Sequence, residues 1–95
     1  MTRDITAELA ALRKDYLARL PTKLDELVTL IDARSRTEAR QVAHKLRGTA
    51  GTYGVASFGE AIGAIDDALA GDLDWPTIDG FVTRARTALA EELAR

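Results

Sequence analysis

The chain has 95 residues, of which 46% are hydrophobic and 29% are charged, with a net charge of −2 and no cysteine. This composition predicts one globular domain over residues 1–95 and excludes a disordered chain, a disulfide framework and thiolate metal sites. The slight acidity excludes a general nucleic-acid binder, and no apolar run approaches the roughly 18 residues of a membrane span. Because the N-terminal segment also lacks the apolar core of a signal peptide, we expect a cytoplasmic protein.

An apolar stripe runs along the first predicted helix, with its members three or four residues apart, as on one face of a helix. The stripe consists of Ile5, Leu9, Leu12, Tyr16, Leu20, Leu24, Leu27 and Ile31. Pro21 lies inside the stripe, where it removes a backbone donor and clashes with the preceding turn. We therefore expect a kink or a break between Arg19 and Thr22.

Three further helices follow. Ser35 and Glu38 have the spacing of a capping box, which predicts a helix that starts there and runs to Gly54. Ser57 and Glu60 repeat the pattern and predict the start of the next helix. Asp74 and Pro76 suit the start of the last one. The stripes of these last two helices are Val55, Phe58, Ile62, Ile65 and Leu69, and then Trp75, Ile78, Val82, Ala85, Leu89 and Leu93.

The fold class follows from these patterns. No segment shows the two-residue alternation of a strand. Amphipathic helices with short connections bury their stripes best against one another. The sequence therefore predicts an all-α antiparallel four-helix bundle with an N-terminal helical extension or a kinked first helix.

The only histidine, His44, lies in the second predicted helix. On a helical wheel of residues 37–53 it falls about 160° from Leu46, which marks the centre of the core face. The other members of the core face are Ala39, Val42, Ala43, Ala50 and Tyr53, whereas Thr37, Gln41, Gly48 and Gly51 share the side of His44. Arg40 and Arg47 lie on one flank, and Lys45 and Thr52 lie on the other. The wheel thus predicts a solvated imidazole with cations near it.

Gly48 and Gly51 each cost the helix about 1 kcal/mol relative to alanine. Because both face away from the core, close packing inside the molecule does not explain them. Their lack of bulk would let another surface approach His44, and the flanking cations suit an anion such as a phosphoryl group. The alternative interpretation is an ordinary surface histidine near glycines that end the helix.

The segment "AHKLRGTAGTYG" resembles the signature of histidine-containing phosphotransfer (HPt) domains. The matching residues are Ala43, His44, Leu46, Arg47, Gly48, Thr49, Ala50, Gly51 and Gly54. The resemblance implies a four-helix bundle with an N-terminal helical extension. It also implies a phosphorelay intermediate, in which His44 accepts a phosphoryl group from a receiver-domain phospho-aspartate or a kinase and passes it on. Two features depart from the commonest pattern: Arg47 replaces a lysine, and Lys45 adds a second cation.

On this resemblance, His44 is the phosphorylated residue, and Arg47 and Lys45 stabilise the phosphoryl group. The surface that a partner approaches consists of Thr37, Arg40, Gln41, Gly48 and Gly51. We expect a monomeric phosphocarrier without independent catalytic activity, with no metal or cofactor of its own and with Mg²⁺ only on the receiver. The expected partners are receiver domains and a hybrid histidine kinase, with neither nucleic acid nor membrane.

Two other functions compete with this interpretation. One is a non-catalytic adaptor that binds a signalling partner through the same face. The other is a kinase dimerisation domain, whose histidine is followed by an acidic residue and a nearby proline; here Lys45 follows, and no proline lies between Thr22 and Trp75. A zinc site is disfavoured because the histidine has no paired ligand.

Other charges receive ordinary interpretations. We expect solvated or capping roles for Asp66, Asp67, Asp72 and Asp74, and solvent-facing roles for Glu91 and Glu92. Trp75 is interpreted as a core or cap residue.

Overall fold

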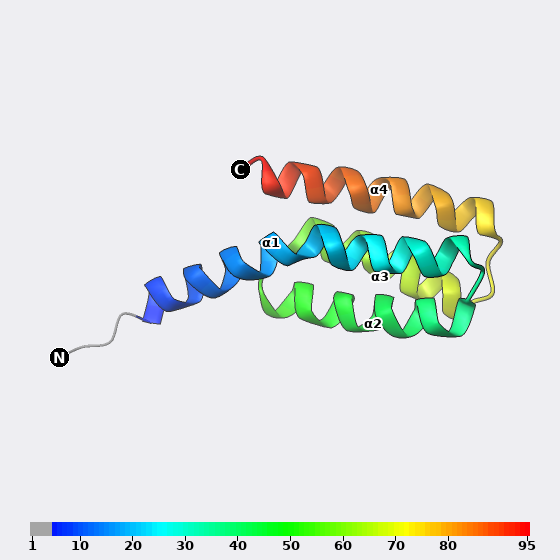
Figure 1. The fold of residues 1–95 in the computed structure, drawn as a ribbon, viewed down its shortest axis with the longest axis horizontal. Coiled ribbons are helices and arrows are strands. Elements are labelled where there is room, and N and C mark those ends of the chain that lie inside the picture. Colours follow the sequence, from blue (N-terminus) through cyan, green and yellow to red (C-terminus); the bar gives the residue numbers. More distant parts are fainter. Residues whose placement is uncertain (1–4) are drawn as a thin grey trace.

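The computed structural model describes residues 5–95, which form four α-helices joined by short connections. They are α1 (Ile5–Asp32), α2 (Arg36–Thr52), α3 (Ala56–Ala70) and α4 (Trp75–Leu93). Successive helices run in opposite directions, and each one packs against two others (Figure 1). This arrangement confirms the all-α bundle. Residues 1–4 of the predicted domain lie outside the described range.

The first turns of α1 extend beyond the ends of α2 and α4, which confirms the N-terminal helical extension (Figure 1). Ile5, Leu9 and Leu12 are 62%, 60% and 51% exposed, whereas the stripe is buried from Tyr16 onward. The expectation that the whole stripe is buried is therefore wrong for its first three members. The reason is length, because α1 has 28 residues and α2 has 17.

Pro21 does not break α1, which is continuous from Ile5 to Asp32. Figure 1 shows a change of direction in the blue part of α1, on the N-terminal side of the segment 19–22 where the kink was expected. Leu20 and Leu24 are both 1% exposed and hold the helix against the bundle on either side of the proline. Their burial offsets the backbone hydrogen bond that proline cannot donate.

The helix starts agree only in part with the predicted caps. α2 begins directly after Ser35 as expected, but the Ser35 side chain forms no capping hydrogen bond. α3 begins at Ala56, so the expected start at Ser57 is wrong, and the buried Val55 precedes the first turn. The cause is Gly54, whose φ of 71° ends α2 and turns the chain sharply enough for Val55 N–H to reach the Ala50 carbonyl at 2.9 Å.

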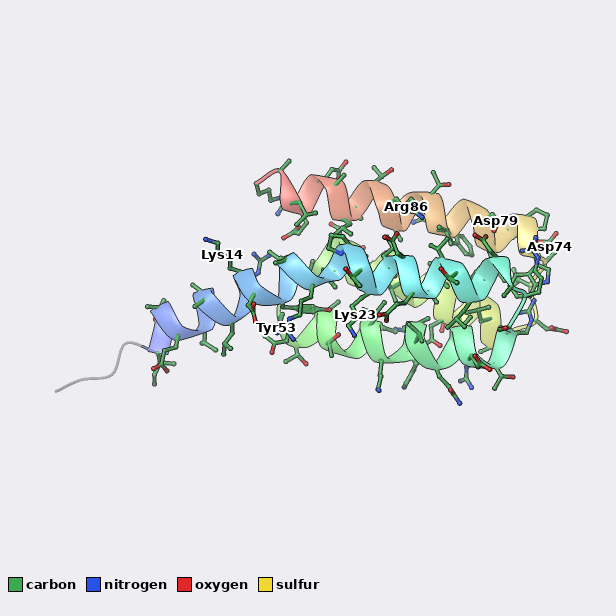
Figure 2. All side chains as sticks on the ribbon, viewed as in Figure 1. Lys14, Lys23, Tyr53, Asp74, Asp79 and Arg86 are labelled. Atoms are coloured by element: carbon green, nitrogen blue, oxygen red, sulfur yellow. The ribbon has the colours of Figure 1, made fainter. Side chains whose placement is uncertain are left out.

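The start of α4 matches its prediction. Asp74 accepts a hydrogen bond from the Thr77 backbone N–H at 3.2 Å. Hydrogen bonding by Thr77, through its side chain first and its backbone second, lowers the pKa of the Asp74 carboxyl group. Trp75 lies partly buried against the core, as expected. Asp74 and Tyr53 mark opposite ends of the bundle (Figure 2).

Glu92 is buried, which overturns its interpretation as a solvent-facing charge; its side chain is 5% exposed. Arg13 of α1 donates one hydrogen bond to its carboxylate and another to the Tyr53 carbonyl at 3.2 Å. Arg95 lies 3.7 Å from the second carboxylate oxygen. These contacts fasten α1, α2 and α4 together where α1 leaves the bundle.

The core face of α2 agrees with the helical wheel. Ala39, Ala43, Leu46 and Ala50 are buried, and Val42 and Tyr53 are packed partly buried against the core. Three of the four buried side chains are alanines, which allows α2 and α3 to pack closely. None of the four described helices combines the length and apolar content that a membrane crossing requires.

Candidate functional site

His44 lies near the middle of α2, and its side chain is 74% exposed. The ring nevertheless has a fixed neighbour: Nδ1 lies 3.0 Å from Oδ2 of Asp66 on α3. The wheel is correct that the imidazole is exposed, but it does not predict the contact with Asp66. A wheel describes a single helix, whereas α3 lies beside the flank of α2 that carries Arg40, His44 and Arg47.

Asp66 supplies the one buried carboxylate of this region, with a side chain that is 5% exposed. Besides His44, its oxygens face the Arg47 guanidinium at 3.4 Å and Arg40 Nε at 3.8 Å. Burial of a carboxylate is costly unless donors and cations surround it, and here α2 provides three. The interpretation of Asp66 as solvated or capping is therefore wrong.

The inward orientation of Asp66 could have been inferred from its spacing to the apolar residues of α3. Asp66 follows Ile62 by four residues and precedes Leu69 by three, and both neighbours are buried. A residue at this spacing lies on the same helical face as the core stripe. The pattern therefore marks Asp66 as inward-facing, and a carboxylate in such a position needs a partner.

The contact between His44 and Asp66 assigns the tautomer of the imidazole. An ionised carboxylate only accepts hydrogen bonds, so Nδ1 of the ring must carry the proton and donate it. In the neutral ring the lone pair then belongs to Nε2, on the far side of the ring from Asp66. The nitrogen capable of nucleophilic attack is thus the one that points away from α3.

Arg47 reaches across to α3 and binds two carboxylates through the same nitrogen. Its NH1 group donates to Asp67 Oδ1 at 3.0 Å and to Asp66 Oδ2 at 3.4 Å. The hydrogen bond with Asp67 is the main cause that raises the pKa of Arg47 above its ordinary value. Because a guanidinium has five N–H donors, Arg47 keeps donors for a further anion.

The positive charge predicted around His44 is compensated in the folded protein. Arg40 and Arg47 lie opposite Asp66 and Asp67, so these four side chains carry no net formal charge. Asp67 is exposed, as expected, but it is also paired. The cations of this cluster are therefore held in place by carboxylates rather than free in solvent.

The surface predicted for partner approach is open. A Cβ atom added at Gly48 or at Gly51 would meet nothing within 4 Å, which excludes close packing among residues 5–95 as the reason for either glycine. Thr37, Arg40 and Gln41 are exposed on the same helix. The role of this surface in partner binding stays a prediction.

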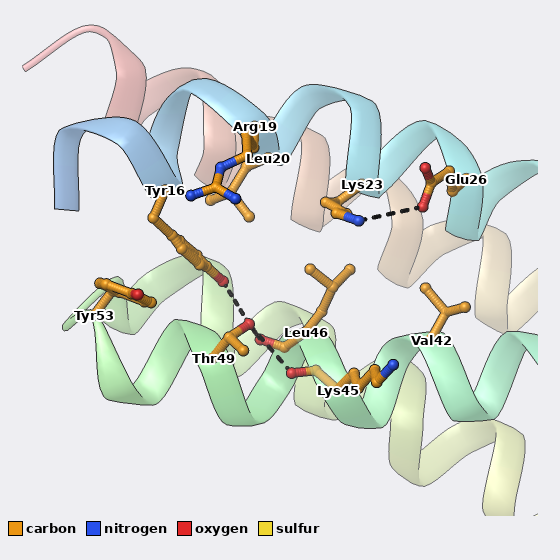
Figure 3. A pocket seen from close by; sticks show the side chains of 10 residues that line it. All are labelled: Tyr16, Arg19, Leu20, Lys23, Glu26, Val42, Lys45, Leu46, Thr49 and Tyr53. Atoms are coloured by element: carbon orange, nitrogen blue, oxygen red, sulfur yellow. Dashed lines mark hydrogen bonds and ion pairs between the residues drawn. The ribbon is translucent and has the colours of Figure 1, made fainter. Parts of the chain in front are cut away.

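Lys45 lies on the other flank of α2, away from Asp66. It lines a groove of about 430 Å³ between α1 and α2 (Figure 3). Within this groove the Tyr16 hydroxyl lies 2.9 Å from Thr49 Oγ1, and burial raises the pKa of Tyr16. The two cations predicted to stabilise a phosphoryl group thus lie on different flanks, and the role of Lys45 stays a prediction.

Comparison with known protein families identifies one match. The Hpt domain family matches residues 11–95, a range that contains every residue of the cluster around His44. No curated protein and no solved structure matches the chain. Hpt domains carry phosphoryl groups in two-component signalling, where they interact with receiver domains and kinases. The matched range and the bundle fold together show that this chain belongs to the Hpt domain family.

Proposed function

We propose that His44 accepts a phosphoryl group on Nε2 from the phospho-aspartate of a receiver domain, or from a kinase, and passes it to the aspartate of another receiver. The observation that carries this proposal is the contact of 3.0 Å between His44 Nδ1 and the buried Asp66, on a ring that is otherwise exposed. An ordinary surface histidine needs no hydrogen bond to a buried carboxylate.

The transfer step is an in-line displacement at phosphorus. The Nε2 lone pair forms the new P–N bond while the P–O bond to the receiver aspartate breaks, and the aspartate carboxylate leaves with the electron pair. The imidazole gains positive charge as the bond forms, and Asp66 stabilises that charge through the Nδ1–H donor. The reverse step delivers the phosphoryl group to the next receiver.

The surroundings of His44 suit this step. Donors of Arg47 that are not directed at the two aspartates can bind phosphoryl oxygens, and electrostatic stabilisation is a main source of catalysis in such transfers. Gly48 follows His44 by one turn and leaves open space for the receiver. The chain acts as a phosphocarrier, and we expect the receiver to supply the Mg²⁺.

The experiment that tests the proposal follows phosphate from a labelled phospho-receiver to the chain. We expect acid-labile phosphate on the wild-type protein, with NMR of the ¹⁵N-labelled imidazole showing the Nε2 isomer. His44→Gln should take up no phosphate. Its thermal stability should stay close to that of the wild type, because the side chain is largely exposed and the glutamine NH₂ group can still donate to the buried Asp66.

Two outcomes would contradict the proposal. Label retained on His44→Gln would place the acceptor on another residue. Undiminished receiver binding by both proteins, without phosphate on either, would identify the chain as a non-catalytic adaptor.

A further inference from the structure

Gly63 lies buried on α3, one turn before Asp66 and Asp67. A Cβ atom added there would lie 3.1 Å from Nε, 3.3 Å from Cζ and 3.6 Å from Cδ of Arg47. The end of the Arg47 side chain therefore crosses α3 directly over the position that a methyl group would occupy. Beyond this point the guanidinium reaches the carboxylates of the next turn.

The backbone does not explain glycine at this position. Gly54 is the only glycine of residues 5–95 with a positive φ, so Gly63 has an angle that any residue adopts. Glycine inside a helix also lowers helix stability relative to alanine. Close approach of the two helices is the explanation one turn earlier, where a Cβ at Gly59 would meet Ala50 Cβ at 3.3 Å. At Gly63 the three nearest atoms all belong to Arg47.

We propose that Gly63 is a positioning residue for phosphotransfer, because a methyl group there would displace the Arg47 guanidinium by a few tenths of an ångström from its place beside Asp66 and Asp67. This inference rests on the proposed function of His44. Asp66 Oδ2 is shared by His44 Nδ1 at 3.0 Å and Arg47 NH1 at 3.4 Å. A displaced guanidinium therefore alters the acceptor that holds the imidazole, as well as the donors that face the phosphoryl group.

The proposal also connects Gly63 with the arginine that replaces the commonest lysine. A guanidinium is planar and places several donors at its rim, so it can lie across a helix and contact two neighbouring carboxylates. A lysine ends in a compact ammonium and has no flat group to lie over the glycine. Gly63 and Arg47 thus act as a pair.

The test measures the rate of transfer from one phosphorylated receiver to Gly63→Ala. We expect a rate about threefold to fivefold lower, the size of effect that follows from weakening one charge-assisted hydrogen bond. The melting temperature should stay the same or rise, since alanine favours the helix. The Arg47 Nε–H and His44 imidazole resonances should both shift in NMR spectra.

Gly59→Ala is the matched control, because it adds the same methyl group between α2 and α3 without touching Arg47. It should leave the transfer rate within about twofold of wild type and the Arg47 resonance in place, as expected for a site with no shared partner. Combining Gly63→Ala with Arg47→Ala should add less than about twofold to the effect of Arg47→Ala alone, since coupled residues are not additive.

Three outcomes would overturn the inference. They are a wild-type rate for Gly63→Ala, an equal loss for Gly59→Ala, and full additivity with Arg47→Ala. Each of these leaves wild-type phosphorylation of His44 intact. By contrast, a wild-type protein that takes up no phosphate would overturn the proposed function itself.

Discussion

The two flanks of α2 differ in what holds their charged groups. On the flank that faces α3, His44, Arg40 and Arg47 surround the buried carboxylate of Asp66. On the flank that faces α1, Lys45 borders a groove whose floor includes Leu20, Val42 and Leu46 (Figure 3). Both flanks carry cations close to His44 in sequence. Only the flank that faces α3 places a buried carboxylate among them.

This difference shows that nearness to the histidine along the chain does not identify the cations that act with it. The buried carboxylate selects among them, since it fixes the Arg47 guanidinium and the imidazole at the same oxygen. Lys45 is adjacent to His44 in sequence, yet none of the residues that line its groove is a buried carboxylate. Three predictions test this comparison.

The largest effect is expected from Asp66→Asn. Asparagine lacks the negative charge and can present either its amide oxygen or its NH₂ group to His44 Nδ1, so the ring no longer has one enforced tautomer. The transfer rate should fall about tenfold to a hundredfold, the loss that follows removal of the partner that orients a metal-binding imidazole. Asp67→Asn is the control, because Asp67 contacts Arg47 but has no contact with the imidazole, and its loss should be smaller. Equal rates for Asp66→Asn and wild type would show that the α3 flank does not orient the histidine.

A smaller effect is expected from the cations themselves. Arg47→Ala should slow transfer about tenfold, because a positioned donor for the phosphoryl oxygens is lost. Lys45→Ala, the matched change on the other flank, should stay within about twofold of wild type, as for an exposed charge without a positioned role. Arg47→Lys should recover part of the rate, since it restores the charge without the planar group. A larger loss for Lys45→Ala than for Arg47→Ala would reverse the comparison.

The smallest effect is expected on the outward surface between the two flanks. Gly48 has open space around it and lies inside α2, so Gly48→Ala should stabilise the protein by up to about 1 kcal/mol. Denaturant unfolding measures this gain, and the transfer rate should change little. Gly48→Leu places a larger side chain in the open space at this position. It should slow transfer while the fold persists. A rate for Gly48→Leu equal to wild type would show that no receiver covers this position.

The fold was predictable because the core stripes of all four helices repeat with a helical period. The helix ends were predictable where one residue decides the local geometry, as Gly54 and Asp74 do. The predicted helix start at Ser57 was wrong because Gly54 and Val55 complete the turn before Ser57. The N-terminal extension of α1 was expected, but periodicity did not reveal that Ile5, Leu9 and Leu12 are exposed there, because it does not show whether a neighbouring helix is long enough to cover a stripe.

The sequence predicted His44 as the centre of the site, but the prediction of the residues around it was incomplete. Asp66 and Glu92 were assigned to solvent because acidic residues usually are, although each lies in phase with the core stripe of its own helix. Their partners come from other helices: Arg13 is 79 residues from Glu92, and His44 is 22 residues from Asp66. Such pairs depend on helix packing, which no local pattern contains.

The projecting start of α1 has a consequence for hydrogen exchange. Backbone amides of residues 9–12 belong to turns whose apolar side chains are exposed, so opening these turns uncovers little buried surface. Their exchange should report local fraying, with protection far below that of the core amides around Leu24 and Leu27. The contacts of Arg13 with Glu92 and the Tyr53 carbonyl mark the point where protection should rise. Fraying that starts at the free end of α1 should therefore stop before it reaches the helix turns that pack against α2.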